Sequence, residues 1–106
     1  MTDHVLDQLF QVIQSRQGAD PQTSYTAKLF AKGRKKIAQK VGEEGLETAI
    51  AAVSETPADI AAESADLLYH LLVLWADAGI DPADVWAELA RRQGISGIAE
   101  KNARPQ

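Results

Sequence analysis

The stretch SETPAD, residues 54–59, separates two long helical segments and decides how the chain folds. Thr56, Pro57 and Asp59 stand in the order of a helix N-cap, a first-turn proline and a third-position acid, which is a strong start signal for a helix. The segment that ends at Ser54 and the segment that follows this signal are therefore expected to pack as an antiparallel helical hairpin.

Helical periodicity extends outward from this turn in both directions. Residues from about Thr26 to Ser54 are predicted to be helical, with a bend or interruption near Gly33. On the other side, a helix that carries Ile60 to Ala78 is expected to stop at Gly79, a favourable C-terminal cap.

Two further helices are predicted at the ends of the chain. The first runs from about Asp3 to Arg16 and has an apolar stripe, and the last begins with Asp81 and Pro82 and ends near Arg92. We find no strand pattern and no repeat. The expectation is an all-α fold in which residues 1–106 form a single domain, a bundle of about four helices.

Length and composition restrict the class of protein. The 106 residues are 45% hydrophobic and 25% charged, as in globular domains, and carry a formal net charge of -4. Such a charge argues against a nucleic-acid or membrane partner. Without cysteine, a basic leader pattern or a long apolar run, the sequence favours a cytoplasmic location.

The segment LLYHLLVLW, Leu67 to Trp75, has no polar face wide enough for solvent. A helix that is apolar all round is expected to be buried on every side. In a chain this short, that burial requires a second subunit, and a homodimer is the simplest arrangement.

Two acidic pairs flank the turn with the same spacing. Glu44 and Glu47 are three residues apart, as are Glu63 and Asp66, so each pair lies on one helix face. Residue 55 is the midpoint of 44 and 66 and also of 47 and 63. An antiparallel hairpin therefore places Glu44 level with Asp66 and Glu47 level with Glu63, and the four carboxylates converge.

Converging carboxylates need a positive partner. Oxygen ligands without Cys or clustered His select Mg²⁺, Mn²⁺ or Ca²⁺ over softer metals. Mg²⁺ commonly completes its ligand shell with substrate phosphates, which would make this patch a phosphate site. The alternative is that the acids are solvated surface residues, as is common for either pair alone.

Basic and aromatic neighbours share these faces. Lys40, Lys36 and Lys32 follow one another at one-turn intervals and lead into the acidic patch, either as phosphate contacts or as solvated lysines. His70 lies one turn after Asp66 and would either support a ligating carboxylate or be a buried core residue.

These motifs resemble a known superfamily. EExxE at Glu43, Glu44 and Glu47, followed by ExxD at Glu63 and Asp66, is similar to the signature of the MazG-like all-α nucleotide pyrophosphatases. The resemblance implies that Glu44, Glu47, Glu63 and Asp66 hold Mg²⁺, with Mn²⁺ as a substitute.

Longer stretches resemble one family within it. SYTAKLFAKG (24–33), KIAQKVGEE (36–44), ADLLYHLLVL (65–74) and GISGIAEKNAR (94–104) are similar to the phosphoribosyl-ATP pyrophosphatase family of histidine biosynthesis. This implies a homodimeric hydrolase that converts phosphoribosyl-ATP, its nucleotide substrate, to phosphoribosyl-AMP and pyrophosphate. Glu43 would then support a ligand or accept a proton from the attacking water. The implied substrate contacts are Lys28, Lys32, Lys40, His70, Ser96, Lys101 and Arg104.

Two other functions fit parts of the pattern. A house-cleaning pyrophosphatase for nucleoside triphosphates would use the same metal site. A non-enzymatic helical dimerisation module would leave the acids solvated, but it gives no reason for their mirrored placement about the turn.

Overall fold

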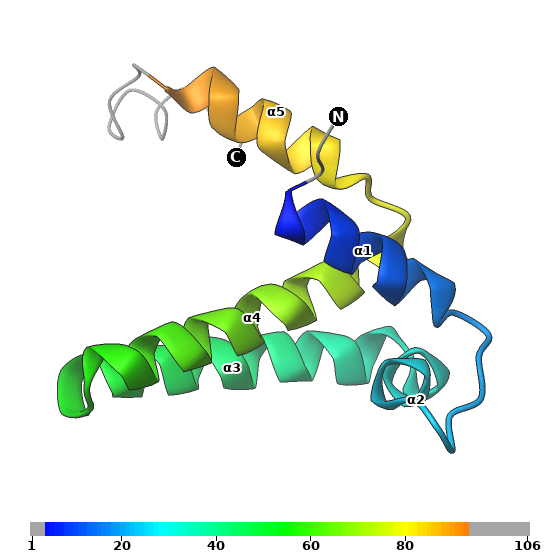
Figure 1. The fold of residues 1–106 in the computed structure, drawn as a ribbon, viewed down its shortest axis with the longest axis horizontal. Coiled ribbons are helices and arrows are strands. Elements are labelled where there is room, and N and C mark those ends of the chain that lie inside the picture. The colour runs from blue at the N-terminus through cyan, green and yellow to red at the C-terminus, as the bar shows by residue number, and fades with distance from the viewer. Residues whose placement is uncertain (1–3, 94–106) are drawn as a thin grey trace.

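The computed structural model describes residues 4–93, which form five α-helices and, in that range, no strand. The helices are α1 (Val5–Ser15), α2 (Tyr25–Lys32), α3 (Arg34–Ser54), α4 (Pro57–Ala78) and α5 (Pro82–Arg92) (Figure 1). The all-α prediction is confirmed.

Gly33 divides the segment that was expected to be helical from Thr26 to Ser54. Its φ of 95° and ψ of 174° lie far from helical values, and its N–H closes α2 by bonding to the carbonyls of Leu29 and Phe30 at 3.2 Å. Glycine takes a positive φ without the steric cost that a Cβ would bring. The predicted interruption is therefore a complete break, which is why the described chain has five helices rather than about four.

The turn between α3 and α4 forms as predicted. The Thr56 hydroxyl accepts from the Asp59 N–H at 3.3 Å, and the Asp59 carboxylate accepts from the Thr56 N–H at 3.3 Å. This reciprocal capping box starts α4, with Pro57 as its first residue. At the other end Gly79, with a φ of 73°, caps the helix as expected.

The helices α3 and α4 form a long antiparallel hairpin, and α1 and α2 lie near the end of it that is remote from the turn (Figure 1). The core is built there, from Phe10, Ile13, Leu29, Ile37, Leu72, Val73 and Ala76. Arg34 at the start of α3 bonds to both the side chain and the carbonyl of Asp77 on α4, which fastens this end of the hairpin. The half of the hairpin nearer the turn consists of α3 and α4 alone.

This outer half leaves apolar side chains in solvent. Leu46, Ile50 and Val53 follow one another along an exposed face of α3, and Val53 is 86% exposed. On α4, His70, Leu72 and Val73 are buried, but Leu68 is 41% exposed. A single chain therefore does not bury the segment 67–75 on every side, and its burial by a second subunit stays a prediction.

Within residues 4–93, no helix is both long and apolar enough to cross a bilayer.

Candidate functional site

Carboxylates from the two arms of the hairpin meet between α3 and α4. Glu44, Glu63 and Asp66 each offer an oxygen atom, and these three atoms lie within 4.8 Å of one another. Glu44 is buried, Glu63 is half-buried and Asp66 is exposed, so the group opens to solvent on the Asp66 side. The mirrored spacing about residue 55 predicts that four carboxylates converge, and the structure brings three of them together.

Glu47 belongs to the same electrostatic site although it is not one of those three residues. Burial raises the pKa of Glu44, and the adjacent Glu47 carboxylate raises it further. Burial and Glu47 likewise raise the pKa of Glu63. Both carboxyl groups therefore hold their protons more tightly than usual, because a buried, crowded negative charge is unfavourable.

Two of the oxygens in this site have no hydrogen-bond partner in the part of the chain that the structure describes. Oε2 of Glu44 and Oε2 of Glu63 are buried and accept no hydrogen bond from residues 4–93. Buried polar atoms are nearly always paired, and an unpaired carboxylate oxygen is costly. Two unpaired oxygens inside a carboxylate group fit a cation, and hard oxygen ligands of this kind suit Mg²⁺ or Mn²⁺.

Lys40 lies beside the carboxylates, as its spacing on α3 predicted. Its Nζ is 3.3 Å from Glu43 and 3.8 Å from Glu44. Gln39 donates to the other oxygen of Glu43 at 2.8 Å. The bonds from Gln39 and Lys40 lower the pKa of Glu43, which makes this carboxylate a weak base and a firm anchor for Lys40.

His70 is both buried and close to the carboxylates, so the two predicted roles are not exclusive. Its Nδ1 lies 2.8 Å from the backbone carbonyl of Asp66, so the histidine bonds to the main chain of that residue and not to its carboxylate.

Tyr25 is the site residue that the sequence analysis missed. Ser24 caps α2 by accepting from the Ala27 N–H at 3.1 Å, which makes Tyr25 the first residue of the helix. The Tyr25 hydroxyl then lies 3.2 Å from Nε2 of His70. The stretch SYTAKLFAKG contained Tyr25, but no spacing rule connects a residue of α2 with α4.

The other predicted substrate-binding residues are not placed at the carboxylate group by the structure. Lys28 and Lys32 are exposed on α2, and their contact with phosphate stays a prediction. Ser96, Lys101 and Arg104 lie outside the described residues.

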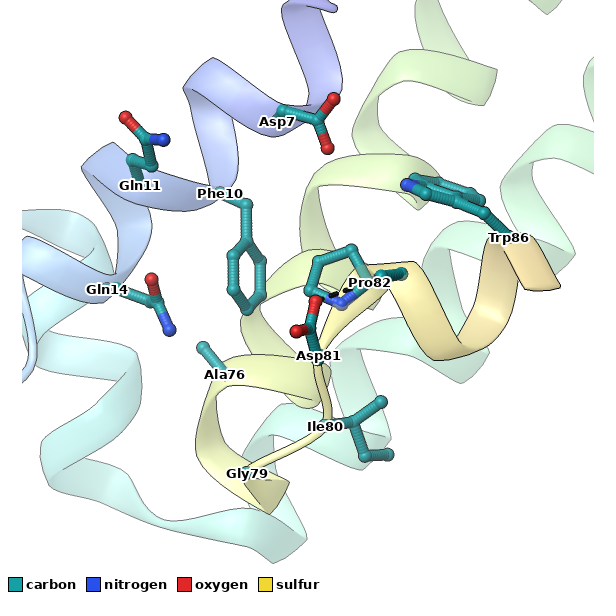
Figure 2. Close-up of a pocket in the computed structure, with 11 residues that line it drawn as sticks. Asp7, Phe10, Gln11, Gln14, Ala76, Gly79, Ile80, Asp81, Pro82 and Trp86 are labelled. Carbon is teal, nitrogen blue, oxygen red and sulfur yellow. Dashed lines mark hydrogen bonds between the residues drawn. The ribbon is translucent and has the colours of Figure 1, made fainter. Parts of the chain in front are cut away.

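A separate hollow of about 380 Å³ lies between α1, the end of α4 and the start of α5 (Figure 2). Phe10 and Trp86 line it together with Asp7 and Asp81, and none of the predicted site residues does. Asp81 already caps α5 by accepting from the Ala83 N–H at 2.9 Å. The residues that line this hollow are therefore separate from the carboxylate group.

Comparison with known proteins establishes the family to which the chain belongs. A family model described as phosphoribosyl-ATP pyrophosphohydrolase matches residues 6–93. The chain belongs to this family. The match includes both arms of the hairpin and all four predicted metal ligands.

Named members of the phosphoribosyl-ATP pyrophosphohydrolase family are similar over nearly the whole chain. A phosphoribosyl-ATP pyrophosphatase from Azospirillum brasilense is 68% identical over 100 residues, covering 94% of this chain and 90% of that protein. One from Paramagnetospirillum magneticum is 65% identical, covering 94% of this chain and 92% of that protein. A histidine biosynthesis bifunctional protein from Wolinella succinogenes is 53% identical, and the match covers 44% of its length.

Proposed function

We propose that this protein hydrolyses phosphoribosyl-ATP to phosphoribosyl-AMP and pyrophosphate, the second step of histidine biosynthesis. The observation that carries the proposal is the carboxylate group of Glu44, Glu63 and Asp66, found inside a chain of this family with two buried oxygens unpaired. A cation held by this group would allow a site that is itself negative to bind a substrate that carries several negative charges.

Mg²⁺ is the proposed cofactor, with Mn²⁺ as a substitute. Glu44, Glu47, Glu63 and Asp66 would hold it, because three of them converge and the fourth acts on the same electrostatic site. When bound, the metal neutralises the phosphates and lowers the pKa of a water molecule that can attack phosphorus.

The other groups of the site bind and orient. Lys40 places a positive charge 3.8 Å from Glu44, and its ion pair with Glu43 fixes its position, so we assign Lys40 to a substrate phosphate. Because the pKa of Glu43 is lowered, holding Lys40 is a better role for Glu43 than accepting a proton. We assign the rest of the phosphate chain to Lys28 and Lys32.

The direct test is mass spectrometry of the products formed from phosphoribosyl-ATP with and without Mg²⁺. We expect phosphoribosyl-AMP and pyrophosphate only when the metal is present. Intact substrate in the presence of Mg²⁺ and folded protein would overturn the assignment.

A substrate panel separates the neighbouring function. A house-cleaning enzyme would hydrolyse common or damaged nucleoside triphosphates with an efficiency similar to that for phosphoribosyl-ATP. We expect instead a kcat/KM at least about 100-fold higher for phosphoribosyl-ATP, because the second phosphoribosyl group supplies contacts that those nucleotides lack.

We also propose that the protein is a homodimer in the cytoplasm. The exposed apolar face of Leu46, Ile50 and Val53 on α3, with Leu68 on α4, supports the dimer because such faces are normally covered. Light scattering after size exclusion should give twice the chain mass of 11.5 kDa. The substitution Val53→Lys should shift it toward the monomer, whereas Val12→Lys on α1 should not.

A further inference from the structure

Tyr25 combines an exposed ring with a hydroxyl that is held from inside the protein. The side chain belongs to a residue that is 54% exposed, yet its hydroxyl lies 3.2 Å from a ring nitrogen of His70, which is only 6% exposed. The two rings stand edge to face, with centroids 6.1 Å apart and planes at 83°. The tyrosine is therefore fixed in direction while much of its surface stays open to solvent.

The direction of the hydrogen bonds follows from the partner of the other ring nitrogen. Nδ1 of His70 lies 2.8 Å from the carbonyl oxygen of Asp66, which can only accept, so Nδ1 carries the proton. In the neutral imidazole Nε2 is then an acceptor, and the Tyr25 hydroxyl donates to it. A line of two hydrogen bonds thus runs from the backbone of Asp66 through His70 to Tyr25.

This line places Tyr25 beside the carboxylates. Asp66 is one of the three residues whose carboxylate oxygens converge, and His70 lies one helical turn further along α4. Through His70, Tyr25 is therefore connected to the helical turn that carries Asp66, on the exposed side of the carboxylate group.

We propose that Tyr25 contacts the substrate and binds its nucleoside part, with the ring stacking on the adenine, and that His70 is a positioning residue that holds Tyr25 there. This inference rests on the proposed function. Aromatic rings stack on bases with a useful gain in affinity. The hydroxyl uses its hydrogen to donate to His70, so its lone pairs are left to face the substrate. These lone pairs repel a phosphate but accept a hydrogen bond from a ribose hydroxyl.

The test compares Tyr25→Leu, which loses the ring, with Tyr25→Phe, which keeps it. In the holoenzyme with Mg²⁺, we expect Tyr25→Leu to raise KM for phosphoribosyl-ATP about tenfold or more with little change in kcat. Tyr25→Phe should stay within about threefold of the wild type. Val12→Ala, at an exposed position of α1, is the control and should leave KM unchanged.

Two ligands separate this contact from the reaction itself. Calorimetry with Mg²⁺ should show that Tyr25→Leu weakens binding of α,β-methylene-ATP about tenfold but leaves inorganic tripolyphosphate unaffected. This measurement needs no turnover, so it is independent of the hydrolysis proposed above. Three results would each overturn the inference. Wild type and Tyr25→Leu could bind α,β-methylene-ATP with equal affinity, Tyr25→Leu could lose equal affinity for both ligands, or the wild type could fail to bind the methylene compound.

The positioning role of His70 has its own readout. His70→Gln should raise KM, and adding it to Tyr25→Phe should produce no further rise, because both substitutions remove the same hydrogen bond. Additive effects would show that His70 acts on KM without Tyr25. Melting temperatures of the four proteins identify any loss of fold, and if His70→Gln is unfolded, the Tyr25 variants alone decide the proposal.

Discussion

Glu44 on α3 and Asp66 on α4 carry carboxylate oxygens within 4.8 Å of each other, although the turn at residues 54–59 separates them in the sequence. With Glu63 they form a negative group that the fold alone does not stabilise, since two of its oxygens have no partner among residues 4–93. Groups of this kind are common where function opposes stability.

Neutralising one carboxylate should stabilise the metal-free protein and remove its response to metal. Glu44→Gln keeps the shape of the side chain but removes a carboxylate whose pKa is raised by burial and by the neighbouring Glu47. We expect a higher melting temperature without Mg²⁺ and no further rise when Mg²⁺ is added. Activity should fall by more than about 100-fold, because even residues that only hydrogen-bond to a metal ligand contribute about 10–100-fold.

Glu55→Gln is the matched control for this experiment, because Glu55 is exposed in the turn and outside the carboxylate group. It should retain the wild-type response to Mg²⁺. A Glu44→Gln protein that is still stabilised by Mg²⁺ would show that the metal binds elsewhere.

The capping box at the turn should control the stability of the hairpin. Thr56→Ala removes the hydroxyl that accepts from the Asp59 N–H, and we expect a loss of about 1 kcal/mol in the free energy of unfolding. Thr56→Ser keeps the acceptor and should recover most of the loss. Urea denaturation of the three proteins measures the differences, and equal midpoints would contradict the role given to the cap.

The ion pairs of α5 should give stability that depends on pH. Arg91 and Arg92 bond to Glu88 and lower its pKa to about 2. Glu88 is ionised at a lower pH when folded than when unfolded, so its contribution is fully present above about pH 4.5 and is lost as the pH falls toward about 2.

Glu88→Gln removes this contribution. The variant should be less stable than the wild type at pH 7, and the difference in unfolding free energy should shrink as the pH falls below about 4.5. Urea titrations of both proteins at several pH values measure it. A difference that stays constant from pH 7 to pH 3 would show that another property of Gln causes it.

Much of this fold could be predicted from local chemistry. Thr56, Asp81 and Gly79 act at helix ends through atoms only a few residues away, so the sequence alone locates them. The register of the hairpin follows from the tight turn, and it correctly placed Glu44 near Asp66 and Glu63.

Features that depend on packing between distant segments were not predictable in the same way. Tyr25 meets His70 only because α2 lies against α4, and no periodicity in the sequence encodes that contact. The spacing of the four acids about residue 55 also gives no difference in burial between them. In the structure Glu44 is buried and Asp66 exposed, because the two helices turn different parts of their faces to each other.

Replacing glycine by alanine should have opposite effects on stability at Gly33, which precedes α3, and at Gly45, which lies inside it. Gly33 has a φ of 95°, which strains any side chain, so Gly33→Ala should destabilise the protein by about 1 kcal/mol or more. Gly45 lies inside the helix, and an added Cβ would meet no atom within 4 Å. Gly45→Ala should therefore stabilise the protein by about 1 kcal/mol through helix propensity alone. Chemical denaturation of both variants at one protein concentration measures the pair. A loss of stability in Gly45→Ala would mean that another molecule, such as a second copy of this chain, approaches α3 at this position more closely than a methyl group allows.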